Sequence, residues 1–207
     1  MRYDYEIDVS NPKSSHRIIA SLIGKGSKVL DVGCSSGFLA KFLHDKKGCY
    51  VVGVEKNSIY YESAKLNCDY FIDGNIENNE LKDSLDEDFD VVVLGDVLEH
   101  LVDPWNVLKD LKKYLNSNGF LLVSIPNIAY WRIRRDILIG KFRYTDEGIL
   151  DRTHLRFFDL FSAKEMIENS GYKITYFDVT CFRMPKYLCR WFPSLLAYQF
   201  VFKASTV

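Results

Sequence analysis

The sequence predicts a doubly wound α/β fold in a single domain. Three observations support this prediction: short apolar runs alternate with segments of helical periodicity, several runs are continuously apolar, and the last two runs have only a loop-like segment between them. Alternation predicts parallel strands joined by helices. Continuous apolar runs are typical of strands covered on both faces. The last two runs predict an antiparallel hairpin at one end of the sheet.

The expected sheet has seven strands, mostly parallel, with helices on both faces. Strands are expected over 28–32, 50–54, 69–72, 90–94, 119–125, 172–179 and 197–203. Helices are expected near 16–23, 37–47, 57–66, 104–115 and 162–170. The fourth helix has clear end signals, because Asp103-Pro104 opens it and Asn118-Gly119 follows it.

Composition narrows the class of protein. The chain has 207 residues, 47% hydrophobic and 27% charged, which fits one globular domain over 1–207. Its formal net charge of -1 does not suggest a nucleic-acid partner. Five scattered cysteines predict neither a disulfide framework nor a zinc site, and so favour a reduced, cytoplasmic protein. The charged N-terminus is unlike a signal peptide, and no apolar run reaches the roughly 18 residues of a membrane helix.

Two regions of the domain are expected to cover its site. Residues 1–25 are predicted to form a helical lid region. Segment 126–160 interrupts the strand–helix rhythm and is rich in arginine and aromatic residues, including Tyr130 and Arg134. Because it follows a strand's carboxyl end, where such sheets place substrates, we predict a substrate-binding insertion. Its mixed basic and apolar character is also compatible with contact at a membrane surface.

The first turn of the predicted sheet is bare. The stretch "VLDVGCSSGFLAKFL" leaves its strand at Asp31 and places Gly33 and Gly37 around Cys34-Ser35-Ser36. Glycine permits a tight turn, and the N–H groups that open the next helix can face a ligand. The pattern predicts a nucleotide-like ligand at this turn.

The spacing of this turn argues against a dinucleotide. The fingerprint G-x-G-x-x-G, counted from Gly33, meets Ser35 and Phe38 at its second and third glycine positions. Glu55 ends the next strand within "VVGVEKN", where an acid can accept hydrogen bonds from both hydroxyls of a ribose. A ligand with one nucleoside and an amino-acid tail suits this combination.

At this point the chain resembles the class I S-adenosylmethionine-dependent methyltransferases. The matching pieces are "VLDVGCSSGFLA", "VVGVEKN", "FIDGNIE", "FDVVVLGDVLEHLVDP" and "GFLLVSIPN", which cover roughly residues 25–127 in the order of that family. The resemblance implies a Rossmann-like fold of seven strands with an antiparallel last strand, an enzyme, and S-adenosyl-L-methionine as its cofactor.

The resemblance also implies roles for particular residues. Asp31, Gly33 and Gly37 would frame the methionine part of the cofactor, Glu55 would hold the ribose, and the backbone of Gly95-Asp96 would lie near the transferred methyl group. The other expected cofactor contacts are Cys34, Ser35, Lys56, Asn75 and Ile76. Two of these depart from the family pattern: Ser35 replaces a frequent glycine, and Asn75 replaces the aspartate that usually meets the adenine amino group. The Asn75 side-chain oxygen can still accept that hydrogen bond.

The phrase "DRTHLRFF" supplies candidates for acceptor chemistry. If the segment is extended, Arg152, His154 and Arg156 share one face. We predict His154, with His100 as the second candidate, to be the general base, and the two arginines to bind the acceptor. The alternative is a surface lattice in which the arginines pair with Asp151 or Asp159.

The phrase "GDVLEH" leaves two interpretations. Some methyltransferases of quinone biosynthesis and of small-RNA ends resemble it and hold a magnesium-type ion with an acid-x-x-Glu-His motif, which here would be Asp96, Glu99 and His100. The other interpretation is a capping box with Glu99 at its third position. We favour the capping box, and expect no metal.

The sequence therefore predicts methyl transfer from S-adenosylmethionine, to an oxygen of a sugar or another polyhydroxylated acceptor, including anionic ones. "DRTHLRFF" and "PSLLAYQFVF" resemble, more loosely, methyltransferases associated with polysaccharide biosynthesis. The alternatives are a quinone-type or other small-molecule O- or C-methyltransferase, and a non-catalytic cofactor-binding partner of a biosynthetic assembly.

Overall fold

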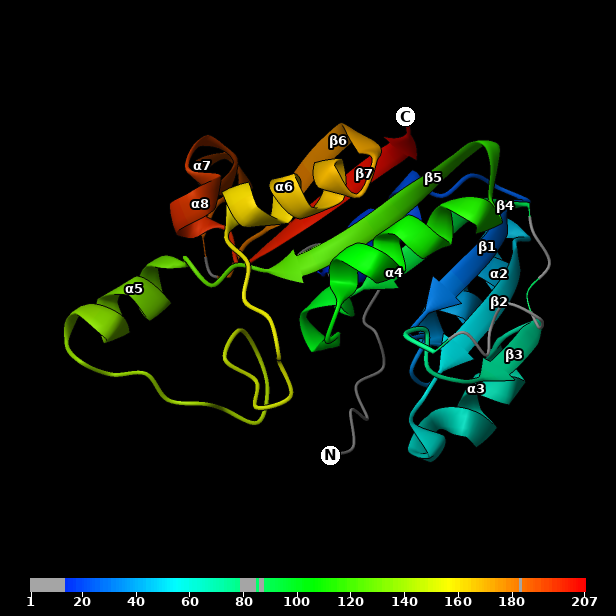
Figure 1. The fold of residues 1–207 in the computed structure, drawn as a ribbon, viewed down its shortest axis with the longest axis horizontal. Coiled ribbons are helices and arrows are strands. Elements are labelled where there is room, and N and C mark those ends of the chain that lie inside the picture. Colours follow the sequence, from blue (N-terminus) through cyan, green and yellow to red (C-terminus); the bar gives the residue numbers. More distant parts are fainter. Residues whose placement is uncertain (1–13, 79–84, 86–87, 183) are drawn as a thin grey trace.

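A computed structural model describes residues 14–78, 85, 88–182 and 184–207. Its centre is one seven-stranded sheet in the order β3-β2-β1-β4-β5-β7-β6 (Figure 1). The strands are β1 (Lys28–Val32), β2 (Tyr50–Glu55), β3 (Tyr70–Asp73), β4 (Phe89–Gly95), β5 (Leu115–Pro126), β6 (Tyr172–Thr180) and β7 (Gln199–Thr206). Neighbouring strands are parallel from β3 to β5, and β7 lies antiparallel between β5 and β6. The predicted fold class is therefore confirmed.

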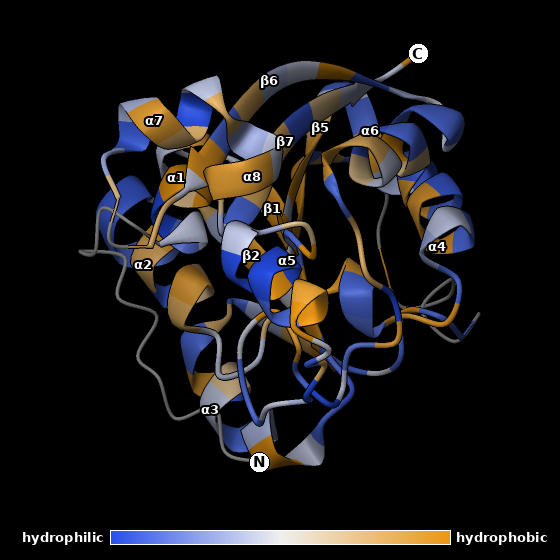
Figure 2. Cartoon of the chain, turned by 90° about the vertical axis from the view of Figure 1, so that its left-hand side faces the viewer, coloured by the Kyte–Doolittle hydropathy of each residue, from blue (hydrophilic) through white to orange (hydrophobic). Residues whose placement is uncertain are grey.

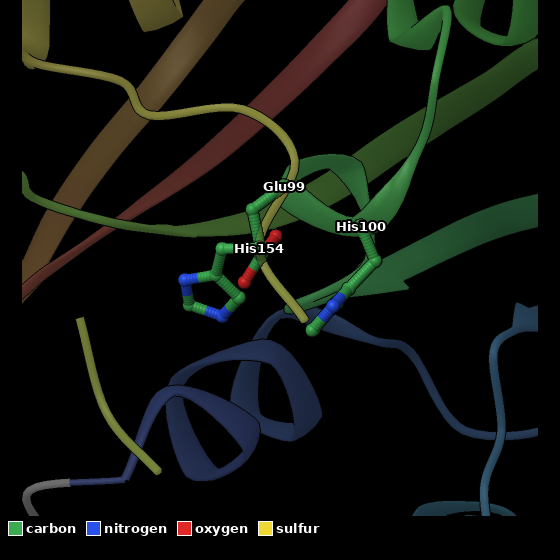
Figure 3. A group of neighbouring side chains, drawn as sticks. All are labelled: Glu99, His100 and His154. Carbon is green, nitrogen blue, oxygen red and sulfur yellow. The ribbon is translucent and has the colours of Figure 1, made fainter. Parts of the chain in front are cut away.

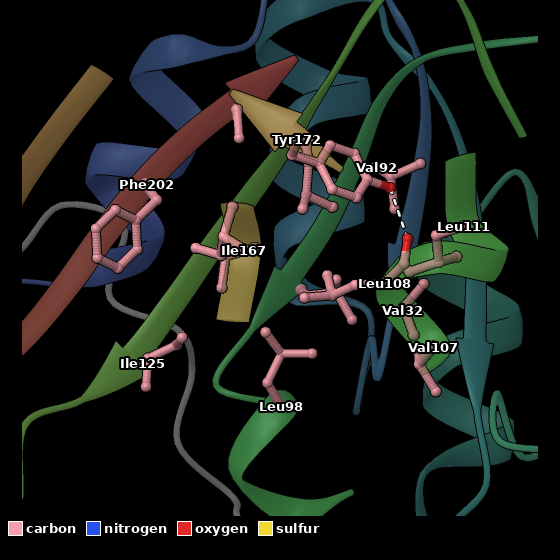
Figure 4. Packing of buried hydrophobic residues seen from close by; sticks show 14 of the residues in the cluster. Val32, Val92, Leu98, Val107, Leu108, Leu111, Ile125, Ile167, Tyr172 and Phe202 are labelled. Carbon is pink, nitrogen blue, oxygen red and sulfur yellow. Dashed lines mark hydrogen bonds between the residues drawn. The ribbon is translucent and has the colours of Figure 1, made fainter. Parts of the chain in front are cut away.

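Helices cover both faces of this sheet. Helices α4 (Pro104–Leu111) and α6 (Leu160–Asn169) pack with one core cluster, while α1 (Ser15–Leu22) and α2 (Phe38–Lys47) pack with the other. Successive residues of a strand contribute to opposite cores: Leu94 belongs to the first cluster and Val93 to the second. Figure 4 shows the first core, where the buried Tyr172 hydroxyl donates to the Leu108 carbonyl at 2.9 Å. Both faces are apolar because both are covered.

Three element boundaries differ from the prediction. Strand β5 begins at Leu115, because that residue pairs with Phe89, and the preceding helix ends at Leu111 with a 3-10 turn after it. The helix expected near 57–66 is a 3-10 turn, Ser58–Tyr60, followed by α3 (Tyr61–Asn67). The hairpin connection is helical rather than a plain loop, since α7 (Lys186–Trp191) and α8 (Pro193–Leu196) lie between β6 and β7.

The expectation about disulfides is wrong at one place. Cys181, just after β6, and Cys189, on α7, form a disulfide with their Cα atoms 6.3 Å apart. The helical connection brings them together, and their eight-residue separation carries no such signal. Cys34, Cys49 and Cys68 are free thiols.

The sequence analysis expected two regions, 1–25 and 126–160, to cover the site. Helix α1 packs on the sheet through Ile18 and Ile19, whereas residues 1–13 of the predicted lid lie outside the described residues. In Figure 1 the segment from β5 to α6 extends beyond the sheet and carries α5 (Trp131–Leu138). Helix α5 carries both hydrophilic and hydrophobic residues (Figure 2), and its Ile137 and Leu138 are exposed. Within the described ranges, no helix is both long and apolar enough to span a bilayer.

Candidate active site

A cavity of about 710 Å³ opens at the carboxyl ends of β1, β2, β3 and β4. Its lining includes ten of the eleven residues predicted to contact the cofactor: Asp31, Gly33, Cys34, Ser35, Glu55, Lys56, Asn75, Ile76, Gly95 and Asp96. These residues come from four separate strand ends, which a parallel sheet brings to one edge. The volume lies within the range of small-molecule sites.

The bare turn is held by Glu55. One carboxylate oxygen accepts a hydrogen bond from the Ser35 N–H at 2.9 Å, and the other accepts from the Asn57 N–H at 2.7 Å. Gly33 and Ser35 both have positive φ, of 71° and 50°. Ser35 therefore occupies the left-handed region that favours glycine, and its link to Glu55 offsets that cost. The turn is built so that the Glu55 carboxylate fixes the backbone beside the cavity.

Gly37 has a different role from the one expected. It caps α2 with a φ of 76°, and a Cβ there would lie 2.9 Å from the Cβ of Asn67. Gly37 is not among the residues that line the cavity. It permits close packing of α2 against α3 and shapes the turn from outside the cavity lining.

Asp31 is buried, with 4% of its surface exposed. Burial and the nearby Glu55 carboxylate raise the pKa of Asp31 to about 7. A bound cation would favour its ionised form. Cys34 is buried, and a hydrogen bond with Cys68, together with burial, raises the pKa of its thiol.

Asp96 is fixed at the end of β4. Its φ is 57°, and its two carboxylate oxygens accept hydrogen bonds from the Ser124 hydroxyl at 2.7 Å and the Gln199 amide at 2.9 Å. Strands β5 and β7 thus hold the residue from the side. His16 of α1 also lines the cavity, and burial lowers its pKa while the Asp96 charge opposes that shift.

The capping-box interpretation of Glu99 is wrong. Glu99 lies in the 3-10 turn Leu98–His100, which has no side-chain cap. Its side chain is 1% exposed, and neither carboxylate oxygen has a hydrogen-bond partner among the described residues. Burial, with the Asp96 charge second, raises the pKa of Glu99 well above its usual value.

Two histidines face this carboxylate (Figure 3). One ligand-type atom from each of Glu99, His100 and His154 lies within 4.8 Å of the others, and the two imidazole centroids are 4.7 Å apart. Nδ1 of His100 contacts the Thr153 carbonyl at 3.1 Å, and Nδ1 of His154 contacts the Ile149 carbonyl at 3.0 Å. Burial and the neighbouring His154 lower the pKa of His100. The structure therefore brings the two predicted catalytic histidines together in the cofactor cavity.

The two predicted acceptor arginines lie elsewhere. Segment 151–154 is a turn rather than extended, closed by the His154 N–H donating to the Asp151 carbonyl at 3.1 Å. Arg152 pairs with Asp146 at the surface, and the Arg156 guanidinium donates to the Val102 carbonyl. Neither arginine lines the cavity, whereas Asp151, Thr153, His154 and Leu155 do. The assumed alternation of faces is wrong because the turn breaks it.

A second cavity of about 410 Å³ adjoins the first, since Gly148 and Tyr198 line both. Its lining includes Tyr130, as the sequence analysis predicted. It also includes three basic side chains, Arg132, Lys141 and Arg143, and two acidic ones, Asp136 and Glu147. Tyr130 is 3% exposed, and its hydroxyl has no hydrogen-bond partner within the described part of the chain. The predicted Arg134 lies outside this lining, and its guanidinium donates to the carbonyls of Ala129 and Ser194.

A protein-family comparison identifies the relationship of the chain. The family described as "Methionine biosynthesis protein MetW" matches residues 13–202. The chain belongs to the MetW family. Nearly the whole domain is included in the match, from the start of α1 to the middle of β7.

Curated relatives of this MetW-family chain are methyltransferases. Ubiquinone biosynthesis O-methyltransferase of Pasteurella multocida is 32% identical over 130 residues, which cover 56% of this chain and 52% of that protein. Ribosomal protein L11 methyltransferase of Thermosipho africanus is 30% identical over 113 residues, covering 54% and 42%. The chain thus spans about half the length of the curated relatives it matches.

Solved structures share the fold over almost the full chain. A SAM-dependent methyltransferase from Thermotoga maritima has a TM-score of 0.67 at 19% identity, covering 93% of this chain and 88% of that one. Magnesium protoporphyrin IX methyltransferase from Synechocystis PCC 6803, solved with bound SAH, has a TM-score of 0.67 at 16% identity, covering 98% and 83%. The class I methyltransferase fold is confirmed, and the class of these relatives supports the predicted enzyme and cofactor.

Some site residues escaped the sequence analysis. Tyr198 and Gln199 at the start of β7 line the cavity, and Thr153 contacts His100. They lie in the phrases "PSLLAYQFVF" and "DRTHLRFF", but neither phrase indicates that these three residues reach the site. Tyr198 and Gln199 reach it because β7 is inserted between β5 and β6.

Proposed function

We propose that this MetW-family chain is an S-adenosylmethionine-dependent methyltransferase that acts on an oxygen of a small acceptor. The observation that carries the proposal is the cavity at the strand ends, lined by ten of the predicted cofactor residues. The names of the curated relatives and of the solved structures with this fold support it.

The residues of the cavity fit the cofactor. Each Glu55 oxygen uses one lone pair on a backbone amide, so the carboxylate retains capacity for ribose hydroxyls. An ammonium group of the cofactor next to Asp31 would stabilise the charge of that carboxylate, and Ile76 would offer an apolar surface to the adenine. When bound, S-adenosylmethionine supplies a methyl group activated by its sulfonium. The chain's contribution is to orient the two reactants and to exclude water.

The acceptor is assigned to the second cavity. Three basic side chains outnumber the two acidic ones in its lining, and guanidinium binds phosphate or carboxylate through two parallel hydrogen bonds, so an anionic group is favoured. A phosphate-linked sugar, as in polysaccharide biosynthesis, satisfies this requirement, although none of the relatives named above acts, by its name, on a glycan. A quinone-type or other small acceptor agrees with the name of the Pasteurella relative. A cytoplasmic location stays a prediction.

Calorimetry tests the cofactor. We expect one molecule of S-adenosylmethionine or S-adenosylhomocysteine to bind per chain, and NAD not to bind. NAD binding in place of both would overturn the assignment.

Charge reversal tests the acceptor site once an acceptor is known. Lys141→Glu and Arg143→Glu should each raise the KM for an anionic acceptor about tenfold. Lys46→Glu, which changes an exposed lysine of α2, should not. Cofactor affinity should stay constant in all three variants. Equal KM values would remove the second cavity from the acceptor site.

A second function follows from the family description, which names a biosynthetic role rather than a reaction. The chain would bind the cofactor as a non-catalytic partner in methionine biosynthesis. Incubation with labelled S-adenosylmethionine and cell extract separates the two functions, because the enzyme incorporates methyl groups and the partner only binds.

A further inference from the structure

The cluster of Glu99, His100 and His154 has a feature that methyl transfer to an acceptor does not explain. Glu99 is almost fully buried, yet both of its carboxylate oxygens lack a hydrogen-bond partner among the described residues. An unpartnered buried carboxylate is strongly unfavourable unless a cation or a donor compensates it. The side chain points toward two imidazoles rather than toward solvent (Figure 3).

The hydrogen bonds of the histidines define which ring atoms are free. A carbonyl oxygen can only accept, so the contacts of both Nδ1 atoms with carbonyls place their protons on Nδ1. Nε2 of His100 and of His154 then each carry a lone pair. Metal-binding histidines in proteins typically donate their other N–H to a carbonyl or carboxylate in this way.

Further hydrogen bonds hold the His100 ring in place. The Thr153 hydroxyl and N–H donate to the buried Asp151 carboxylate at 2.6 and 2.7 Å, and Thr153 in turn contacts Nδ1 of His100. This chain of hydrogen bonds orients the His100 ring. Asp96, in contrast to Glu99, already accepts a hydrogen bond at each carboxylate oxygen, from Ser124 and from Gln199.

We propose that Glu99, His100 and His154 bind a first-row divalent cation such as Mn²⁺, Fe²⁺, Co²⁺ or Zn²⁺. Two imidazoles and one carboxylate form the ligand set that such ions use while keeping open positions. Mg²⁺ prefers oxygen ligands and is the weaker candidate. The three ligand atoms, within 4.8 Å of one another, would draw closer around the ion, whose bonds to them are about 2.0–2.2 Å long.

This site contradicts the expectation of no metal and differs from the set that the sequence motif suggested. His154 takes the place of Asp96, and it comes from a segment more than fifty residues along the chain. Both histidines become ligands, so His154 is no longer the general base.

Glu99, His100 and His154 line the same cavity as Glu55 and Asp31, so an ion that they held would be accessible from it. The role of the ion rests on the proposed function: it would bind the acceptor oxygen and lower the pKa of its hydroxyl. In the transfer, the O–CH₃ bond forms as the S–CH₃ bond breaks, the sulfur leaves as a neutral thioether, and the hydroxyl proton passes to water.

Metal binding is tested on the full chain after treatment with EDTA, without cofactor. Calorimetry with Mn²⁺ and Zn²⁺ should give one ion per chain, with Mg²⁺ at least about tenfold weaker. Glu99→Gln and His154→Ala should each weaken Mn²⁺ binding by at least about tenfold, whereas His44→Ala, which removes an exposed histidine, should not. Wild-type protein that binds no stoichiometric ion, prefers Mg²⁺, or binds Mn²⁺ equally in all variants would overturn the proposal.

A second measurement needs no variant, so it is independent of folding. Pulsed electron paramagnetic resonance on the Mn²⁺-loaded wild type should show coupling to imidazole nitrogens, and its absence would overturn the assigned ligands. Calorimetry with S-adenosylmethionine on the EDTA-treated protein separates the two proposals. If the protein binds Mn²⁺ but does not bind S-adenosylmethionine, the proposed function is refuted and the metal site stands.

Discussion

At the residue scale, Asp31 carries the clearest consequence for pH. Its pKa rises from a usual value near 3.8 to about 7 on folding, because it is buried beside Glu55. Between these values the folded protein binds more protons at Asp31 than the unfolded chain does, so Asp31 makes the free energy of unfolding fall as pH rises. The slope from this residue is at most about 1.4 kcal/mol per pH unit.

Asp31→Asn should remove that slope. Urea unfolding of the wild type without ligand should show a stability that falls relative to Asp31→Asn from about pH 4 to pH 7, with a constant difference above pH 8. Asp73→Asn, which changes an exposed carboxylate, should run parallel to the wild type. A constant difference across the whole range would show that Asp31 titrates normally.

Glu55 links the cofactor to the turn at the same scale. Glu55→Ala removes the acceptor for the Ser35 and Asn57 amides as well as the expected ribose contact. We expect S-adenosylmethionine affinity to fall by roughly 1–3 kcal/mol, the range for lost charge-assisted hydrogen bonds. Calorimetry measures this, with the exposed Glu62→Ala as the control. Equal affinities for the two variants would argue against a ribose contact.

At the scale of elements, segment 150–159 contains residues that line the cavity and others that attach the segment to the rest of the protein. Arg156 anchors the segment, because its guanidinium donates to the Val102 carbonyl and lies 5.8 Å from the Trp105 ring. Arg152 makes an exposed ion pair with Asp146. The segment thus reaches the cavity through the turn that carries His154.

These contacts reverse the predicted roles of the two arginines. Arg156→Ala should lower the free energy of unfolding by about 1 kcal/mol, the scale of a net hydrogen bond, whereas Arg152→Ala should stay within about 0.5 kcal/mol of the wild type. Neither should change the KM for the acceptor. Thermal unfolding and steady-state kinetics check both statements, and a raised KM in either variant would restore the arginine to the acceptor site.

At the scale of the whole molecule, β7 connects β5 to the edge strand β6. Phe202 is fully buried between β5 and β6 and packs near Phe177 and Phe200. Because β7 also delivers Gln199 to Asp96, the stability of this edge and the geometry of the site are connected.

Phe202→Ala should therefore destabilise the protein by about 3–5 kcal/mol, the usual cost of truncating a buried phenylalanine. Urea unfolding measures this cost. Phe161→Ala removes an equally large but exposed ring and should change stability by less than about 0.5 kcal/mol. Similar midpoints for the two variants would show that the β7 core contributes little.

Local pattern determined the architecture and the cofactor side of the cavity. Apolar runs at strand spacing, the bare turn after Asp31 and the acid at Glu55 are short-range signals, and a parallel sheet places such strand ends at one edge. Tertiary structure alone decided the rest, because it depends on contacts between distant segments. It placed His154 beside Glu99, turned Arg152 and Arg156 away from the cavity, and paired Cys181 with Cys189. It also left the Glu99 carboxylate without a donor among the residues that the structure describes. No spacing within the sequence encodes a burial that arises only when a loop folds over a strand end.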